Sequence, residues 1–291
     1  MTMYKVAILG CENSHADSFL QYFLEKKAVK DVEILGIYSD EEEAVRKLQD
    51  RFGVSAMERY DELTGKLDGL IITARHGDNH YKYAKPYIED RIPMFIDKPV
   101  TISPEDAKNF RRELEENRIS ISGGSMCKYN DWVQELRQAV EKGTYGRLCG
   151  GALRAPISLH SKYGGFYFYS QHLIQVLGTI FGYYPKSVQV FPREDVYTCV
   201  FRYPDYDVTG VYVDSSYTYY AGLHCEEKYV GGMYTLDHCA DREVEAFYRI
   251  LSGGAQEISY EDFFAPVYIL NAMDRSVKSG VEEVITYENT V

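Results

Sequence analysis

The sequence predicts an α/β protein with a doubly wound parallel sheet at its N-terminus and an α+β domain, built on a largely antiparallel sheet, at its C-terminus. Apolar strand patterns alternate with helical patterns through the first 122 residues, which is typical of a Rossmann-type sheet. The pair Gly123-Gly124 interrupts this alternation, and tyrosine-rich strand patterns follow one another beyond it. We therefore expect domains at residues 1–122 and 123–291, with the last helix a candidate to pack back on the N-terminal domain.

The N-terminal domain is expected to hold five strands linked by helices in right-handed crossovers. Its strands read as continuous apolar runs because parallel strands are buried on both faces. Asn13 or Ser14 is the expected N-cap of the first helix, and Gly53 ends the second. The expected strands are residues 4–10, 32–38, 67–74, 93–97 and 119–122, and the expected helices are residues 15–27, 41–52, 78–90 and 104–117.

The C-terminal domain begins with a helix that carries Trp132, Leu136 and Val140 at helical spacing. Alternating strand patterns then dominate, and a final helix precedes a short strand. The expected strands are residues 148–157, 187–192, 196–203, 208–219, 226–236 and 283–287, and the further helices are residues 167–182 and 261–279.

Composition excludes several classes of protein. The formal charge of -12 repels polyanions and no basic stripe opposes it, so nucleic acid is not an expected partner. No apolar run reaches the roughly 20 residues of a membrane span, and no signal-like segment opens the chain, so we expect no membrane association and a cytoplasmic location. The six cysteines form no C-x-x-C pair, which predicts reduced thiols rather than a disulfide framework.

Tyrosine is unusually frequent, with 27 tyrosines against one tryptophan, and it is concentrated after about residue 160. Tyrosine suits a half-wet β surface, and a strand-rich second domain explains most of this enrichment. Because large aromatic patches seldom stay exposed, we also expect a homo-oligomer that forms through the outer face of the C-terminal sheet.

The first strand and turn are laid out like a dinucleotide-binding turn. An apolar run ends at Gly10 and a helical pattern opens about four residues later, where a G-x-G-x-x-G fingerprint would lie. Only the first glycine is present, since Glu12 and His15 occupy the other two positions. The backbone amides that open the helix still predict an anion site at Asn13, Ser14 and His15.

Several short motifs in collinear order resemble the glucose-fructose oxidoreductase and inositol dehydrogenase family (Gfo/Idh/MocA). They are Asp68-Gly69-Leu70-Ile71-Ile72-Thr73 followed by His80; Phe95-Ile96-Asp97-Lys98-Pro99, which is similar to the E-K-P signature; Lys128-Tyr129; Gly143-Thr144-Tyr145-Gly146-Arg147; His172 in the place of the histidine of D-x-G-x-H; and residues 259–280 in the place of the last helix. The resemblance spans nearly the whole chain.

The resemblance implies hydride transfer between NAD or NADP and a hydroxyl carbon of a sugar, cyclitol or related small molecule. Lys98 and His172 are then the expected catalytic pair, because a lysine after a parallel strand points into the ligand crevice and an imidazole can take a proton near neutral pH. The expected substrate-binding residues are Lys98, Lys128, His172 and Gln175. The expected cofactor-binding residues are Gly10, Cys11, Asn13, Ser14, His15, Ser39, Asp40, Thr73, Ala74, His80 and Asp97.

Departures from the family pattern leave an alternative open. Phe168 stands where the family has an aspartate, Gln175 where an acid is common, and Ser39 where an acid would bind the cofactor ribose, with Asp40 one place late. Glu12 adds negative charge near a pyrophosphate. The alternative is therefore a non-catalytic ligand-binding or regulatory protein on the same fold.

Metal and thiol chemistry are not expected. His15, His76 and His80, taken with Asp17 or Asp78, follow no recognised ligand spacing, so the sequence predicts no metal site. Cys11 lies near a helix N-terminus, but no partner base can be identified for it.

Overall fold

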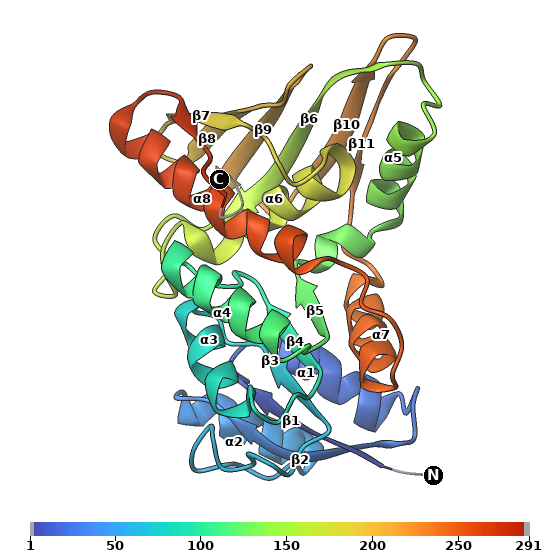
Figure 1. The fold of residues 1–291 in the computed structure, drawn as a ribbon, viewed down its shortest axis with the longest axis vertical. Helices are drawn as coiled ribbons and strands as arrows, with labels where there is room; N and C mark the ends of the chain where they lie inside the picture. Colours follow the sequence, from blue (N-terminus) through green and yellow to red (C-terminus); the bar gives the residue numbers. More distant parts are fainter. Residues whose placement is uncertain (1–2, 288–291) are drawn as a thin grey trace. The chain divides into compact units, whose positions relative to one another are not determined.

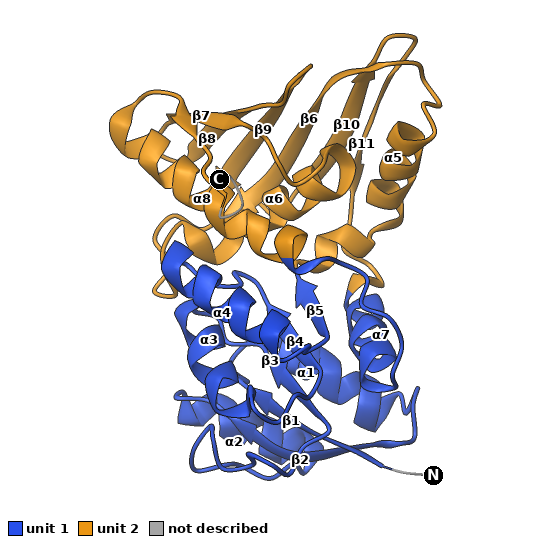
Figure 2. Ribbon diagram, in the orientation of Figure 1, with its two compact units in different colours: residues 1–124, 240–260 blue, residues 125–239, 261–291 orange. Residues whose placement is uncertain are grey.

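A computed structural model describes residues 3–287, and the chain divides into two compact units. The first unit holds the residues up to Gly124 together with Ala240–Tyr260, and the second holds Ser125–Cys239 together with the residues from Glu261 onward (Figure 2). No helix among the described residues is long and apolar enough to cross a membrane.

The first unit is built on a five-stranded sheet in the order β2-β1-β3-β4-β5, in which every pair is parallel (Figure 1). This confirms the expected doubly wound sheet. The order reverses beside β1, and ligands bind in open α/β sheets at the carboxyl ends of strands next to such a reversal. The strands are β1 (Tyr4–Leu9), β2 (Val32–Tyr38), β3 (Gly69–Ile72), β4 (Met94–Asp97) and β5 (Ile121–Gly124).

β5 begins two residues later than expected and contains the glycine pair that we had taken for the domain boundary. Gly123 adopts a φ of +117°, and a Cβ at this position would lie 2.0 Å from the carbonyl oxygen of Ile96 in β4. The glycine therefore belongs to the strand, because only a residue without a side chain allows this close approach.

Four helices link these strands: α1 (Ser14–Leu20), α2 (Glu42–Phe52), α3 (Asp78–Ala84) and α4 (Pro104–Glu116). The first continues as a π-helical stretch over Gln21–Glu25, and the third ends in a 3-10 turn over Lys85–Tyr87. They occupy the expected segments, with shorter α-helical cores at α1 and α3.

A helix that the sequence analysis missed, α7 (Cys239–Leu251), contributes most of its length to the first unit. The final helix, a candidate to pack back on the N-terminal domain, is grouped with the second unit. Phe247 of α7 is fully buried in the N-terminal core, with its ring 5.9 Å from that of Phe19 and 6.5 Å from that of Phe95. Val244, Phe247 and Leu251 recur at helical spacing, so the pattern was present in the sequence.

The second unit is built on a seven-stranded sheet in the order β11-β10-β6-β9-β8-β7-β12. Only the β6 and β9 pair is parallel, so the sheet is largely antiparallel, as expected. The segment expected as one strand over residues 208–219 ends at Asp214, and a separate strand follows it. The strands are β6 (Leu148–Ile157), β7 (Ser187–Pro192), β8 (Val196–Arg202), β9 (Asp207–Asp214), β10 (Tyr219–Cys225), β11 (Tyr229–Tyr234) and β12 (Glu283–Val284).

Helices α5 (Asp131–Glu141), α6 (Tyr167–Phe181) and α8 (Tyr260–Ser279) accompany this sheet. The indole Nε1 of Trp132 in α5 donates to the carbonyl of Ala221 in β10, and the Tyr212 hydroxyl of β9 donates to the carbonyl of Ser170 in α6. The middle of α6 is buried almost completely, which places His172 and Gln175 inside the second unit.

The burial of α7 can be tested with Phe247→Ala. Removing the ring leaves a cavity against Phe19 and Phe95, so the free energy of unfolding should fall by about 3 to 5 kcal/mol. Arg249→Ala, which changes a half-exposed side chain on the same helix, should cost less than about 1 kcal/mol. Denaturant unfolding measures both, and equal costs would contradict the burial of Phe247.

Candidate functional site

The turn after β1 passes very close to the segment after β3. Gly10 adopts a φ of +79°, and a Cβ there would lie 2.3 Å from the backbone of Ala74. The hydroxyl of Thr73 donates to the carbonyl of Gly10 at 3.0 Å, which closes the gap between the two segments. Only a residue without a side chain fits at position 10, as at the first glycine of the fingerprint. The carboxyl ends of β1 and β3 therefore lie together.

Glu12 extends its side chain across these strand ends. Its Oε2 accepts a hydrogen bond from the Ser39 hydroxyl at 2.6 Å, and its Oε1 accepts one from the backbone N–H of Arg75 at 2.9 Å. A carboxylate is therefore present at the end of β2, supplied from the first turn rather than by residue 39. A carboxylate paired with a hydroxyl at this place suits the hydroxyl groups of a cofactor ribose.

Asp40, the other acid expected near the ribose, is held by two tyrosines. It accepts from the Tyr38 hydroxyl at 2.5 Å and from the Tyr83 hydroxyl at 3.0 Å. These hydrogen bonds, the one from Tyr38 first, lower the pKa of Asp40 despite its partial desolvation. Asp40 therefore stays ionised, and its two oxygens are already engaged within the protein.

The start of α1 is capped from inside the chain. Asn13 is the N-cap, as expected, and its Oδ1 accepts from the backbone N–H of His15 at 3.3 Å. Its Nδ2 donates to Oδ2 of Asp97 at 2.8 Å, so one side chain joins the first turn to the end of β4. Ser14 is exposed. Asn13 therefore already accepts from one of the backbone amides that were expected to bind an anion.

His80 and Cys11 are both enclosed by the fold. The ring nitrogens of His80 lie 2.8 Å from the carbonyl oxygen of Ala74 and 3.2 Å from that of Val100, and burial lowers the pKa of this histidine. His80 therefore braces the loops that follow β3 and β4. Burial raises the pKa of Cys11 to about 12, which leaves its thiol protonated and unreactive.

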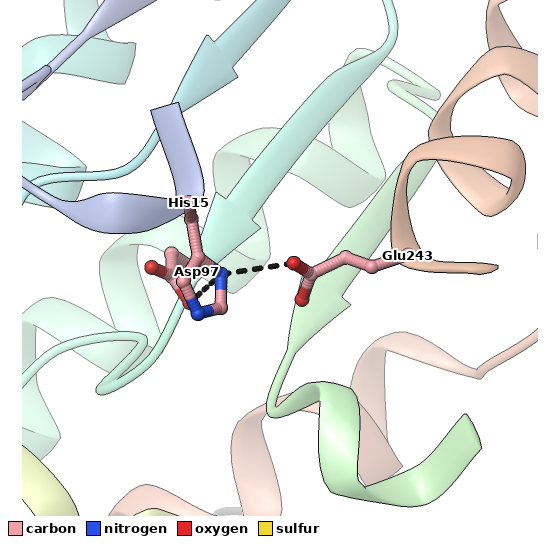
Figure 3. A group of neighbouring side chains, drawn as sticks. All are labelled: His15, Asp97 and Glu243. Atoms are coloured by element: carbon pink, nitrogen blue, oxygen red, sulfur yellow. Dashed lines mark ion pairs between the residues drawn. The ribbon is translucent and has the colours of Figure 1, made fainter. Parts of the chain in front are cut away.

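His15, Asp97 and Glu243 form a buried group whose side chains point toward one another from α1, β4 and α7 (Figure 3). Nδ1 of His15 lies 2.8 Å from Oε2 of Glu243 and 3.5 Å from Oδ1 of Asp97. Burial alone would lower the pKa of His15, but the two carboxylates raise it to about 9. Glu243 was not identified from the sequence, because it lies 146 positions beyond Asp97 on the helix that was missed.

Lys98 follows Asp97 directly at the carboxyl end of β4, and its side chain is buried. Its backbone N–H donates to Oδ1 of Asp97 at 2.7 Å, and its positive charge acts on the titration of Asp97 and His15. Lys98 therefore lies at the carboxyl end of a parallel strand, as expected. Its charge belongs to the same electrostatic group as the buried carboxylates.

In the second unit, His172 is oriented by a residue that the sequence analysis did not consider. Its Nδ1 lies 2.7 Å from the Ser125 hydroxyl and 3.5 Å from the thiol of Cys127. The Ser125 hydroxyl also accepts from the backbone N–H of Cys127 at 3.2 Å, which fixes its position. Ser125 thus supplies the imidazole with a polar partner, which Phe168, in the place of the family's aspartate, cannot do.

The other two expected substrate-binding residues are also buried. The Gln175 amide accepts from the backbone N–H of Ser125 at 3.1 Å and donates to the Tyr183 hydroxyl at 2.6 Å. The ammonium of Lys128 lies 4.9 Å from the ring centroid of Tyr129. Gln175 therefore supports the segment that carries Ser125, which is a structural role.

A parallel sheet with polar side chains gathered at the carboxyl ends of β1, β2 and β4 is the architecture of a dinucleotide-binding protein. Residues 4–123 match the family model GFO_IDH_MocA, described as "Oxidoreductase family, NAD-binding Rossmann fold". This segment therefore has the NAD-binding Rossmann fold of that family, and the resemblance inferred from the sequence is confirmed.

Comparisons with individual proteins agree with this fold. Glucose-6-phosphate 3-dehydrogenase of Bacillus subtilis (strain 168) is 24% identical over 149 residues, which is 50% of this chain but only 40% of the relative. Scyllo-inositol dehydrogenase of Lactobacillus casei, solved with NAD(H) and scyllo-inositol, is similar with a TM-score of 0.82 at 13% identity, covering 98% of this chain and 99% of that one. Myo-inositol 2-dehydrogenase of Lactobacillus plantarum gives a TM-score of 0.85 at 13% identity, covering 98% and 100%.

The contact between Ser125 and His172 can be tested with Ser125→Ala. Losing the hydroxyl should change the tautomer balance of the imidazole, which ¹⁵N NMR of histidine-labelled protein measures, and Ser125→Thr should restore it. Ser161→Ala, in the same unit but outside this contact, serves as the control. Unchanged His172 resonances in Ser125→Ala would show that Ser125 does not orient the ring.

Proposed function

We propose that the protein is an NAD-dependent oxidoreductase that transfers a hydride between the nicotinamide and a hydroxyl-bearing carbon of a sugar or cyclitol. The observation that carries this proposal is the NAD-binding Rossmann segment with Lys98 buried at the carboxyl end of its fourth strand. The similarity to the structures of inositol dehydrogenases supports the substrate class.

In the proposed reaction NAD supplies the hydride acceptor. The Lys98 ammonium holds the oxygen of the reacting hydroxyl and stabilises the negative charge that develops on it. His172 takes the hydroxyl proton at Nε2 when its Nδ1 proton is donated to the Ser125 hydroxyl, because only that tautomer leaves Nε2 as an acceptor.

The preference for NAD rests on Glu12. Its carboxylate lies at the end of β2 against Ser39, so it can accept hydrogen bonds from ribose hydroxyls. The same negative charge would repel the 2′-phosphate of NADP. The Ser39 hydroxyl donates a hydrogen bond to this carboxylate and so orients the Glu12 side chain.

Two observations favour the second candidate, a non-catalytic ligand-binding or regulatory protein. Glu12 stands at the position of the second glycine and already accepts the Arg75 amide, where a bound phosphate or ribose would compete with it. Phe168 stands one helical turn before His172, where the family has an aspartate. The expected homo-oligomer remains a prediction under either function.

Cofactor binding separates the two candidates. Calorimetric titration should give a Kd for NADH in the micromolar range and a Kd for NADPH at least about tenfold higher. Glu12→Gln should reduce that difference because it removes the charge, whereas Glu43→Gln, on the exposed face of α2, should not. If neither cofactor binds more tightly than about 1 mM, the oxidoreductase proposal fails and the second candidate is favoured.

Turnover tests the two catalytic assignments separately. With a panel of inositols and hexose phosphates as substrates, Lys98→Met and His172→Asn should each lower kcat by about 10²- to 10⁴-fold while the fold persists by circular dichroism. Lys47→Met and His224→Asn, which change exposed side chains of the same types, should leave kcat unchanged. A variant of Lys98 or His172 with wild-type kcat would refute that residue's role.

A further inference from the structure

We propose that His15, Asp97 and Glu243 form a binding site for a divalent transition metal ion, for which Zn²⁺ is the probe. The three residues lie in the first unit, on α1, β4 and α7, and one ligand atom from each lies within 4.8 Å of the other two. This inference does not depend on the proposed function, because none of its steps involves a cofactor or substrate.

The distances between the ligand atoms suit one shared ion. Zinc binds histidine nitrogens and carboxylate oxygens at about 2.1 Å, so neighbouring ligands of one ion lie roughly 3.0 to 3.4 Å apart. Here Nδ1 of His15 lies 2.8 Å from Oε2 of Glu243 and 3.5 Å from Oδ1 of Asp97. One imidazole and two carboxylates are ligands that Zn²⁺ accepts, and three protein ligands leave a coordination position for water.

The hydrogen bonding of the group points to an additional partner. Within residues 3–287, three atoms of the group lack a hydrogen-bond partner of acceptable geometry: both carboxylate oxygens of Glu243 and Nδ1 of His15. Glu243 is nevertheless only 1% exposed. A buried carboxylate without donors is costly, so the orphaned oxygens call for a cation. Figure 3 shows Nδ1 of His15 directed at one oxygen of Glu243 and at Asp97.

Asp97 is prepared as a ligand by contacts from outside the group. Its Oδ2 accepts from Nδ2 of Asn13 at 2.8 Å, and its Oδ1 accepts from the backbone N–H of Lys98 at 2.7 Å. Hydrogen bonds of this kind orient the carboxylate ligands of metal sites. The same Oδ1 also lies 3.5 Å from Nδ1 of His15.

The competing occupant is a proton. A protonated His15 would balance one of the carboxylates, and the charge of Lys98 would offset the other. Nδ1 of His15 and both oxygens of Glu243 lack a hydrogen bond of acceptable geometry, which favours the metal, although a protonated imidazole would pair with Glu243 at 2.8 Å. The two occupants differ in what a titration with metal shows.

A bound ion would join α7 to α1 and β4. The three ligands are far apart in the sequence, and an ion that binds only the folded state stabilises it in proportion to the logarithm of its concentration. The expected consequence is a higher unfolding temperature with the ion and a lower one after treatment with a chelator.

The experiment begins with the full chain stripped by EDTA and dialysed. Calorimetric titration with ZnCl₂ should show one equivalent bound with a Kd below about 1 μM, and the unfolding temperature should rise. Glu243→Gln and His15→Gln should bind Zn²⁺ at least about 100-fold more weakly. His76→Gln, which changes a partly exposed histidine 3.9 Å from Asp78, should bind as the wild type does.

X-ray absorption at the zinc edge of the wild-type complex keeps the test decisive if the buried variants do not fold. One imidazole with oxygen ligands and no sulfur supports the site, whereas a sulfur ligand places the ion at a cysteine and overturns it. If the wild type does not bind one equivalent of Zn²⁺, the metal proposal is overturned as well, and a protonated His15 paired with the carboxylates is the remaining explanation. Tight binding by folded Glu243→Gln would also refute the proposal.

Discussion

The carboxylate of Asp97 is fully buried at the carboxyl end of β4, and much of the first unit is arranged to stabilise it. Desolvation raises the pKa of Asp97, while the nearby charges of His15 and Lys98 act in the opposite direction. Asn13 and the backbone of Lys98 supply its hydrogen bonds. Through these contacts one buried acid joins the first turn, the fourth strand and, by way of His15 and Glu243, the helix α7. The same cluster lies beside the lysine to which we assign the reacting hydroxyl, so charge neutralisation and the proposed chemistry use one small group of residues.

The bulky residues that replace the fingerprint glycines have separate structural effects. Glu12 turns toward the end of β2, where it places a carboxylate beside Ser39. His15 turns toward β4 and α7, where it faces the buried acids. A glycine at either position could make neither contact. The altered turn therefore redistributes charge along the sheet edge: an acid that other Rossmann proteins carry after the second strand is supplied by the first turn, and a basic group is added next to Asp97. When this turn accepts a dinucleotide, Glu12 exchanges its hydrogen bond from the Arg75 amide for one from a ribose hydroxyl.

The parallel sheet, its helices and the position of Lys98 could be predicted because each depends on local pattern. Continuous apolar runs such as Leu70–Ile72 identify buried strands, and a lysine after such a run lies at the sheet edge whatever the rest of the chain does. The helix α7 was missed although Val244 and Phe247 show helical spacing, because no element was assigned to residues 237–260. Glu243 was missed with it. Ser125 carried no signal, since a serine after a glycine pair is common in loops, and its contact with His172 depends on folding over 47 positions.

The sequence by itself determined the alternation of strands and helices, the Rossmann-type order of the N-terminal segment and the family that this segment resembles. These features follow from periodicity and short motifs, which act over a few residues. Only the tertiary structure decided which polar side chains lie against each other: Glu12 against Ser39, His15 against Glu243, and His172 against Ser125. A buried polar group must find a partner within about 3 Å, and the partner is supplied by whichever segment the fold brings there. That choice depends on the packing of distant segments, so it cannot be read along the chain.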